Sequence, residues 1–255
     1  MLEIEKEGRV CRIILNRPEK RNALNGDLVD DLQLQFDNAF ADDDIKLIIL
    51  SGKGEAFCAG ADLSMLQRLQ KASYEENLAD SGKLGRLFLT IHNGPKIVLG
   101  AIHGYAIAGG CGLAGVCDIS IASHNAKFGY TEVRIGFVPA IVTRLLLDKV
   151  GETRAKKLLL SGNLISAKEA QDIGLITEAV APEDFDKHIE TWTDTLLTKV
   201  SGEAVSQTKY LINKLPDMSL NKAISDSVIV NASARSSTDC QRGIEAFLKK
   251  EKISW

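Results

Sequence analysis

The fold of this chain is decided by the stretch Gly100-Ala-Ile-His-Gly-Tyr-Ala-Ile-Ala-Gly-Gly-Cys-Gly-Leu-Ala-Gly-Val-Cys-Asp118. The apolar run Ile97 to Ile102, which leads into it, predicts a buried strand. Three glycines, the first of them Gly109, then open a segment with helical composition, Leu113 to Val116. A glycine-rich turn between a strand and a helix leaves backbone N–H groups uncovered at a helix N-terminus. We therefore expect a site for a negatively charged oxygen at this turn.

The same glycines allow two other interpretations. Gly110, Gly112 and Gly115 satisfy G-x-G-x-x-G, the fingerprint of dinucleotide binding, and Glu132 lies roughly 20 residues on, where an acid that binds a ribose is expected. That fingerprint belongs on the turn directly after the strand, however, and here His103 to Ala108 intervene. The glycines could also serve only the packing of a helix. Of the three interpretations, the anion site is favoured and NAD binding is the weakest.

Composition excludes several classes of function. With 255 residues, 45% of them hydrophobic, the chain can bury a sizeable core. Its 31 basic and 34 acidic residues form no long run of one sign, which argues against nucleic acid and membranes as partners. The charged N-terminus has no signal-peptide core, so a cytoplasmic protein is expected. Five scattered cysteines indicate reduced thiols, and no spacing typical of metal ligands occurs, so we expect no metal.

Strand and helix patterns alternate along the first two thirds of the chain. Strands are predicted at residues 10–15, 46–50 and 118–122, a helix at 28–40, and a polar, helix-prone lid at 64–81. Beyond Pro139 the patterns are helical, at 140–150, 152–160 and 167–172, in a longer segment between Pro182 and Pro216, and in the amphipathic end 239–250. This order predicts an α/β core with parallel strands over residues 1–190 and a helical region over 191–255.

Four motifs in this order resemble the crotonase, or enoyl-CoA hydratase/isomerase, superfamily. They are Asn16-Arg17-Pro18-Glu19-Lys20-Arg21-Asn22-Ala23-Leu24-Asn25, Phe57-Cys58-Ala59-Gly60-Ala61-Asp62-Leu63, the stretch from Gly104 to Asp118, and Ser161-Gly162 through Ala170 with Gly174-Leu175. The resemblance runs from about residue 8 to 250. It implies a spiral of repeated ββα units, a C-terminal helical region that builds homotrimers or dimers of trimers, and an acyl-CoA thioester as substrate. Coenzyme A is then part of the substrate, and no other cofactor is expected.

The resemblance places an oxyanion hole at Ala61 and Gly109. Their backbone N–H groups match the pair that holds the thioester oxygen in the family. Small residues flank both positions, as needed where an acyl-CoA must approach bare backbone. Enolate chemistry requires such a hole because reaction at the α and β carbons places negative charge on that oxygen.

The carboxylates are where the chain departs from the family pattern. Hydratases of the family usually carry a glutamate three residues after the second hole residue, and here that position is Gly112. The second family glutamate is present as Glu132, in Phe128-Gly129-Tyr130-Thr131-Glu132. Glu132 could also be an ordinary solvent-facing turn residue. If it is catalytic, one carboxylate must exchange every proton, and the space left at Gly112 is expected to admit an extra water or a bulkier substrate.

Four functions follow from this carboxylate pattern. The favoured one is hydration of a 2-enoyl-CoA, branched like 3-methylglutaconyl-CoA, because the segments at residues 61–67, 74–78 and 131–142 are similar to bacterial methylglutaconyl-CoA hydratase-like proteins. A Δ3,Δ2-isomerase needs only one carboxylate, which moves a proton between C2 and C4. Another crotonase-type reaction, such as decarboxylation or thioester hydrolysis, is a third. A CoA-binding scaffold without catalysis is the fourth.

The resemblance also implies a set of substrate contacts. Beside the hole these are Lys20, Arg21, Ala23, Ala59, Gly60, Asp62, Leu63 and Gly112, together with Phe247 and Lys250 from the last helix of a neighbouring subunit. The basic members can equally be solvated surface charges. The apolar residues of that helix have little to pack on in a core complete by residue 190, which predicts an oligomer.

Overall fold

A computed structural model describes all of residues 1–255, and a six-stranded sheet forms its centre. The strand order is β1 (Leu2–Glu7), β2 (Val10–Leu15), β3 (Leu47–Gly52), β4 (Ile97–Ile102), β6 (Ile119–Ser123) and β9 (Glu178–Val180). All neighbouring pairs are parallel except β1 and β2. The predicted parallel core is therefore confirmed. The edge strand β1 was not predicted, because its charged residues conceal a short alternation of apolar and polar positions.

A second, three-stranded sheet gives the fold its repeat. It contains β5 (Tyr105–Ile107), β7 (Lys127–Gly129) and β8 (Ile165–Ser166). Strand β4 enters the large sheet, β5 enters the small one, and helix α4 (Gly109–Val116) follows; β6 and β7 repeat this path before helix α5 (Ala140–Val150). Single bridges from Ala56 to Gly104 and from Cys58 to Ala106 connect the small sheet to the loop between β3 and α2 (Leu63–Leu69). The spiral of ββα units is confirmed.

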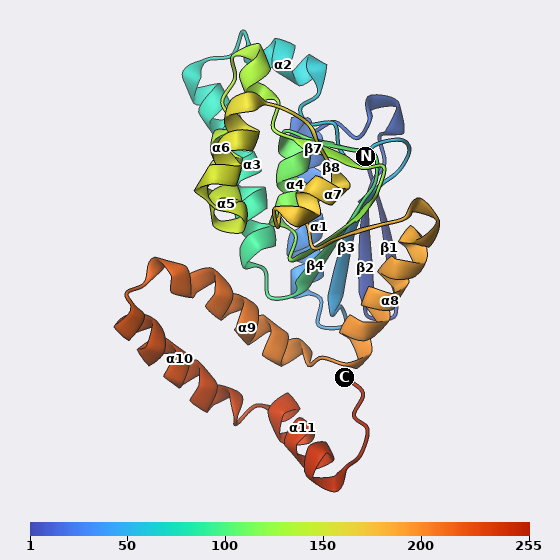
Figure 1. Ribbon diagram of the computed structural model, residues 1–255, viewed down its shortest axis with the longest axis vertical. Helices are drawn as coiled ribbons and strands as arrows, with labels where there is room; N and C mark the ends of the chain where they lie inside the picture. The colour runs from blue at the N-terminus through green and yellow to red at the C-terminus, as the bar shows by residue number, and fades with distance from the viewer.

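Helices cover both faces of the large sheet (Figure 1). One face packs on α1 (Gly26–Ala41), α3 (Tyr74–Asn93), α4 and α5, beside α6 (Glu152–Ser161) and α7 (Ala167–Asp172). The other face is covered by α8 (Phe185–Thr198), whose Ile189 and Leu196 pack against strand residues such as Leu99. The boundary expected at residue 190 therefore falls inside a helix of the core, because the sheet exposes a second apolar face that only α8 covers. The helical region that stands apart begins at α9.

Two helical segments differ from their predicted extents. The single helix expected between Pro182 and Pro216 is divided at residues 199–201 into α8 and α9 (Gly202–Lys214), where the Ser201 side chain caps α9. The lid expected at residues 64–81 consists of α2 (Leu63–Leu69) and the first part of α3. Ser73 and Glu76 form a capping box that begins α3, and the buried second half of that helix carries it on to Asn93.

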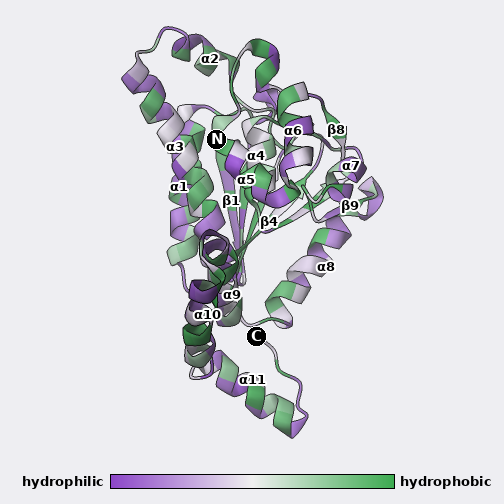
Figure 2. Cartoon of the chain, turned by 60° about the vertical axis from the view of Figure 1, so that its left-hand side comes forward, coloured by the Kyte–Doolittle hydropathy of each residue, from purple (hydrophilic) through white to green (hydrophobic).

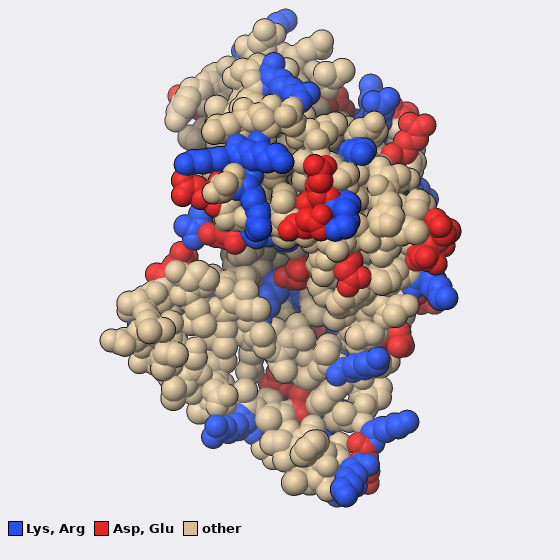
Figure 3. All heavy atoms as spheres, viewed as in Figure 1, with Lys and Arg blue, Asp and Glu red and all other residues tan.

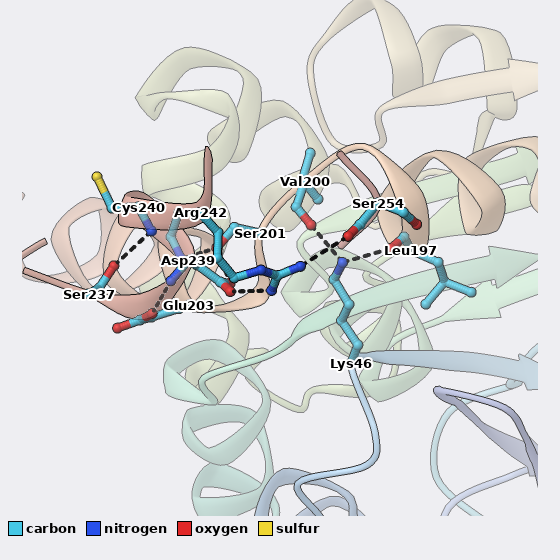
Figure 4. Close-up of polar contacts among 11 residues, drawn as sticks. Lys46, Leu197, Val200, Ser201, Glu203, Ser237, Asp239, Cys240, Arg242 and Ser254 are labelled. Atoms are coloured by element: carbon cyan, nitrogen blue, oxygen red, sulfur yellow. Dashed lines mark hydrogen bonds and ion pairs between the residues drawn. The ribbon is translucent and has the colours of Figure 1, made fainter. Parts of the chain in front are cut away.

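The last three helices extend away from the sheets (Figures 1 and 2). They are α9, α10 (Leu220–Ala234) and α11 (Thr238–Lys249). Helix α9 is anchored by buried Lys209, whose Nζ lies 2.8 Å from an Asp118 carboxylate oxygen. Figure 4 shows how the start of α11 is bound to the start of α9: the Ser201 hydroxyl donates to Asp239, and the Asp239 N–H donates to Glu203. None of the helices combines the length and the apolar character that crossing a membrane requires.

Candidate active site

Two neighbouring loops, one at Ala61 and one that ends at Gly109, each carry a backbone N–H group without a backbone hydrogen-bond partner. In the first, Leu24 N–H donates to Gly60 O at 2.6 Å, and Asp62 N–H donates to Leu24 O at 2.8 Å. These bonds use the groups on either side of Ala61, so the Ala61 N–H points away from residue 24 and makes no backbone hydrogen bond. Gly60 has φ +89°, a conformation open to glycine, and a Cβ there would lie 2.9 Å from Ile107 O. The two loops are therefore in close contact.

The second loop ends at the N-terminus of α4. Gly109 is the first residue of this helix, and its N–H belongs to the turn that has no partner within the helix. Ala108 before it has φ +50° and ψ −119°, a strained conformation for a residue with a side chain. Its N–H donates to Gly129 O at 2.8 Å, which helps to hold the strained turn. Strain of this kind concentrates at functional sites, and here it aims the start of α4.

One cavity of about 330 Å³ touches both N–H positions. It is lined largely by apolar side chains from α1, α2, α3 and the segment that leads into α5. Ala61, Gly109 and Glu132 all line it, and so does Ala59. The structure thus brings together two backbone donors and one carboxyl group at a cavity whose walls are mostly apolar.

Glu132 begins a short 3₁₀ helix, Glu132–Ile135. Its Oε2 atom is buried and has no hydrogen-bond partner. Burial raises the pKa of this carboxyl above its ordinary value, and the only opposing influence is a hydrogen bond from its own backbone. An unpartnered carboxyl oxygen in an apolar cavity is an unsatisfied group that a reacting proton can satisfy.

Gly112 does not leave room in the cavity, and that expectation is wrong. A Cβ at this position would lie 2.6 Å from Val142 Cγ1 and 2.8 Å from Phe88 Cζ. Gly112 is buried and belongs to the packing between α3, α4 and α5 rather than to the cavity lining. The space that a side chain would need is already filled by these two neighbours, which admits neither an extra water nor a larger substrate.

We expect Gly112→Ala to destabilise the protein although alanine is the better helix former. The added methyl must displace Phe88 and Val142, and overpacking of this kind costs about 1–3 kcal/mol. Gly115→Ala, on the same helix, is the matched control, since its Cβ would meet Tyr130 Oη at 3.6 Å in ordinary contact. That variant is expected to gain about 0.4–1 kcal/mol. Urea unfolding of both proteins checks the prediction, and equal midpoints would contradict it.

Asp62, which was expected to contact the substrate, does not line the cavity. Its carboxylate is buried, lies 2.8 Å from Arg17 Nη2, and accepts hydrogen bonds from the backbone and hydroxyl of Ser64 at the start of α2. The Ser64 hydrogen bonds and the Arg17 charge lower the pKa of Asp62. Arg17 also donates to Ala23 O at 2.6 Å. This pair positions the Ala61 loop. Arg17 was quoted as part of a family motif, but the sequence did not indicate this role.

The remaining predicted contacts are dispersed. Lys20, Arg21 and Leu63 are exposed, whereas Ala23 and Gly60 are buried behind the cavity wall. Phe247 is 82% exposed on α11, and Lys250 follows that helix in a left-handed conformation. Helix α11 lies at the opposite end of the molecule from α2 (Figure 1), so these two residues do not reach the cavity of their own chain.

Cavity residues that the sequence did not single out come mainly from two segments. Helix α3 contributes Asp80, Ser81, Lys83 and Leu84, and residues 137–142 form an apolar wall. The only signal for α3 was the polar, helix-prone character of residues 64–81, which was equally compatible with a substrate-facing lid and with a solvent-exposed helix and did not distinguish one polar residue from another. The structure contains no group of three or more His, Cys, Asp or Glu side chains that could hold a metal ion.

The dinucleotide fingerprint does not have the geometry that it requires. Gly110, Gly112 and Gly115 all lie within α4 rather than on the turn before it. A Cβ at Gly110 would lie 2.2 Å from Cys58 O, so this glycine permits close packing against the neighbouring loop. Helix packing therefore explains the glycines at 110 and 112, and the turn ending at Gly109 carries the uncovered N–H.

Comparisons with known proteins show what this sequence and this fold resemble. Residues 5–255 match the family model "Enoyl-CoA hydratase/isomerase". The chain is 34% identical to a crotonyl-CoA hydratase of Syntrophomonas wolfei, over 99% of this chain and 96% of the relative. It is 31% identical to the 2,3-dehydroadipyl-CoA hydratase of Escherichia coli, over 98% and 96%. The crystal structure of an enoyl-CoA hydratase from Shewanella pealeana superposes with a TM-score of 0.94 at 27% identity, covering 100% of this chain and 95% of the other.

Proposed function

Because this chain belongs to the enoyl-CoA hydratase/isomerase family and is an enzyme, we propose that it adds water reversibly to the double bond of a 2-enoyl-CoA thioester. The observation that carries this proposal is the unpartnered Glu132 Oε2 in the same cavity as the Ala61 and Gly109 backbone N–H groups. The cavity supplies donors for an oxyanion and a carboxyl group for proton transfer.

The proposed reaction passes through a thioester enolate. As the water oxygen bonds to C3, the water gives up one proton to a base or to solvent, and the electron pair of the double bond moves to the thioester oxygen, where the two N–H groups stabilise the charge. Collapse of the enolate takes a proton at C2. Glu132 suits this second step, because burial raises its pKa and keeps a larger fraction of the acid protonated near neutral pH.

The acyl group is proposed to be short and branched, with 3-methylglutaconyl-CoA as the first candidate. A cavity of about 330 Å³ with mostly apolar walls suits a small acyl group. The basis for the branch is the similarity of residues 61–67 and 131–142 to methylglutaconyl-CoA hydratase-like proteins, and the packing around Gly112 contributes nothing to it.

A panel of substrates tests this function. Purified protein is incubated with crotonyl-CoA, 3-methylglutaconyl-CoA and a 3-enoyl-CoA, and the absorbance of the conjugated thioester is followed. Loss of absorbance with either 2-enoyl thioester supports hydration. Appearance of absorbance with the 3-enoyl thioester alone supports the second candidate, a Δ3,Δ2-isomerase, which the single family glutamate favours. Binding without turnover of any of them would contradict catalysis and support a scaffold.

We also propose that the enzyme is a homotrimer or a dimer of trimers whose CoA site includes Phe247 and Lys250 of a neighbouring chain. Both residues lie at the end of α11, and Figure 1 shows α11 at the opposite end of the molecule from α2, which lines the cavity. Helix α10 exposes a row of large apolar side chains, and Figure 3 shows few charges over the α9–α10 hairpin. The exposed apolar residues are Leu220, Ile224, Val228 and Ile229 on α10 and Ile244, Phe247 and Leu248 on α11.

Sedimentation at micromolar concentration is expected to give a trimer or hexamer, and Val228→Glu is expected to shift it towards monomer. The substitution places a charge in the middle of a surface that association would desolvate. Leu34→Glu is the matched control, because Leu34 is a similarly exposed apolar residue on α1. A monomeric wild-type protein, or dissociation of both variants alike, would contradict an interface at α10.

A further inference from the structure

A second carboxyl group lines the cavity. Asp80 on α3 lies in the same lining as Glu132, Ala61 and Gly109. Its side chain is only 17% exposed, and it makes no hydrogen bond; its one ionic contact is with Arg68 Nη2 of α2, at 3.6 Å. The Arg17–Asp62 pair in the neighbouring loop is closer, at 2.8 Å, and is supported by hydrogen bonds on both sides. Asp80 is thus a largely buried carboxyl without a committed partner.

The register of α3 places Asp80 on the helix face that packs against α4. Phe88 packs where a Cβ at Gly112 would lie, and Leu84 Cδ2 lies 4.0 Å from the corresponding Cβ position at Gly109. Residues four apart share a helix face, so Asp80 and Ser81 lie one turn further along the same face. Asp80 lines the same cavity as the Ala61 and Gly109 donors, and it pairs with Arg68 of α2.

The two carboxyl groups have different surroundings. Asp80 lines both the acyl cavity and an adjoining hollow of about 480 Å³, and so does Lys83. That hollow is lined mainly by polar and charged side chains, among them Arg68, Lys71 and Asp27. Glu132 Oε2, in contrast, is buried without a partner, and Glu132 does not line the hollow. Asp80 therefore lies where the acyl cavity adjoins a polar hollow.

We propose that Asp80 is the catalytic base for water in this enzyme, so that the hydration is divided between two carboxyl groups. This inference rests on the proposed hydration. As the water oxygen bonds to C3, Asp80 accepts the water proton, and the electron pair of the double bond moves to the thioester oxygen. The enolate then collapses, C2 takes the proton of Glu132, and the two carboxyls return to their starting states by exchange of one proton through solvent. No other reactant is needed.

The electrostatics of Asp80 suit a base. Burial raises its pKa, and the nearby Asp30 acts in the same direction, while Arg68 and Lys83 oppose them. A carboxylate with a raised pKa removes a proton from water more readily than an ordinary aspartate does. The proposal also explains why the structure can fill the space at Gly112 with Phe88 and Val142, since the second carboxyl comes from α3 instead.

The test separates hydration from chemistry that requires Glu132 alone. Asp80→Asn keeps the size of the side chain and removes its basicity, and it is expected to lower kcat for hydration by about 10²–10⁴ with little change in KM. Conversion of a 3-enoyl-CoA to the 2-enoyl isomer, and exchange of the C2 proton of butyryl-CoA with D₂O followed by NMR, require no attacking water. Both are expected to stay within a few fold of wild type, which also reports that the variant is folded.

Two variants control for the ion pair. Arg68→Gln removes the partner of Asp80 and leaves its carboxyl, and Asp30→Asn removes a neighbouring carboxylate that lies outside the acyl cavity. Both are expected to hydrate within a few fold of wild type. Unchanged hydration in Asp80→Asn, or an equal loss of hydration, isomerisation and exchange, would overturn the role of Asp80 while leaving the proposed function intact. A wild-type enzyme that isomerises but never hydrates would instead overturn the proposed function.

Discussion

Glu132→Gln is expected to lower turnover by about 10²–10⁴ while the affinity for the CoA thioester survives, because glutamine keeps the shape of the side chain and cannot exchange the proton. The loss should extend to hydration, isomerisation and C2-proton exchange, since each of them moves a proton at C2. Glu152→Gln is the matched control, because Glu152 also begins a helix but is exposed. Turnover is measured in the steady state and affinity by calorimetry.

The same variant has an expected effect on stability. Burial raises the pKa of Glu132, so the folded protein keeps this proton to a higher pH than the unfolded chain does. The favourable contribution of this group is complete below its unfolded pKa and is lost as the pH rises through the folded value. Glu132→Gln should therefore raise Tm at pH 7 and have less effect in acid. Near-full activity of the variant would contradict the role of Glu132, and a lowered Tm at pH 7 would contradict the unsatisfied state of its carboxyl.

Loss of the Gly109 N–H is the second large effect that we expect. Gly109→Pro removes this donor at the first position of α4, where helix geometry tolerates proline. Removal of one donor from an oxyanion hole costs about 10²–10³ in rate, in kcat more than in KM. Gly109→Ala is the matched control, because it keeps the N–H and introduces the same Cβ, 3.0 Å from the movable end of Leu24.

The comparison between the two Gly109 variants isolates the hydrogen bond. If the rates of Gly109→Pro and Gly109→Ala fall equally, the loss comes from crowding against Leu24, and the oxyanion assignment of Gly109 is wrong. Circular dichroism and thermal unfolding of both proteins establish that the strained turn at Ala108 still forms. A difference of about 100-fold or more between two equally folded variants is the expected result.

The sequence by itself determined the parallel α/β core, because apolar strands bounded by glycine turns are local patterns with a local physical cause, whereas the ββα repeat followed only from the resemblance to the family. It also indicated Ala61, Gly109 and Glu132 as candidates, and the structure brings these three to one cavity. The glycine-rich turn at Gly109 is a short-range signal, whereas the roles of Ala61 and Glu132 followed from the resemblance of their motifs to the family.

Tertiary structure alone decided what occupies the space around these residues. Gly112 looked like a vacancy in the sequence, but Phe88 and Val142, distant along the chain, fill it. Asp62 looked like a substrate contact, but the charge of Arg17 holds it in the loop. Asp80 was one polar residue among several in a helix-prone segment, and only the packing of α3 against α4 placed it in the cavity. Packing and desolvation depend on residues that meet only after folding, which is why no local pattern revealed them.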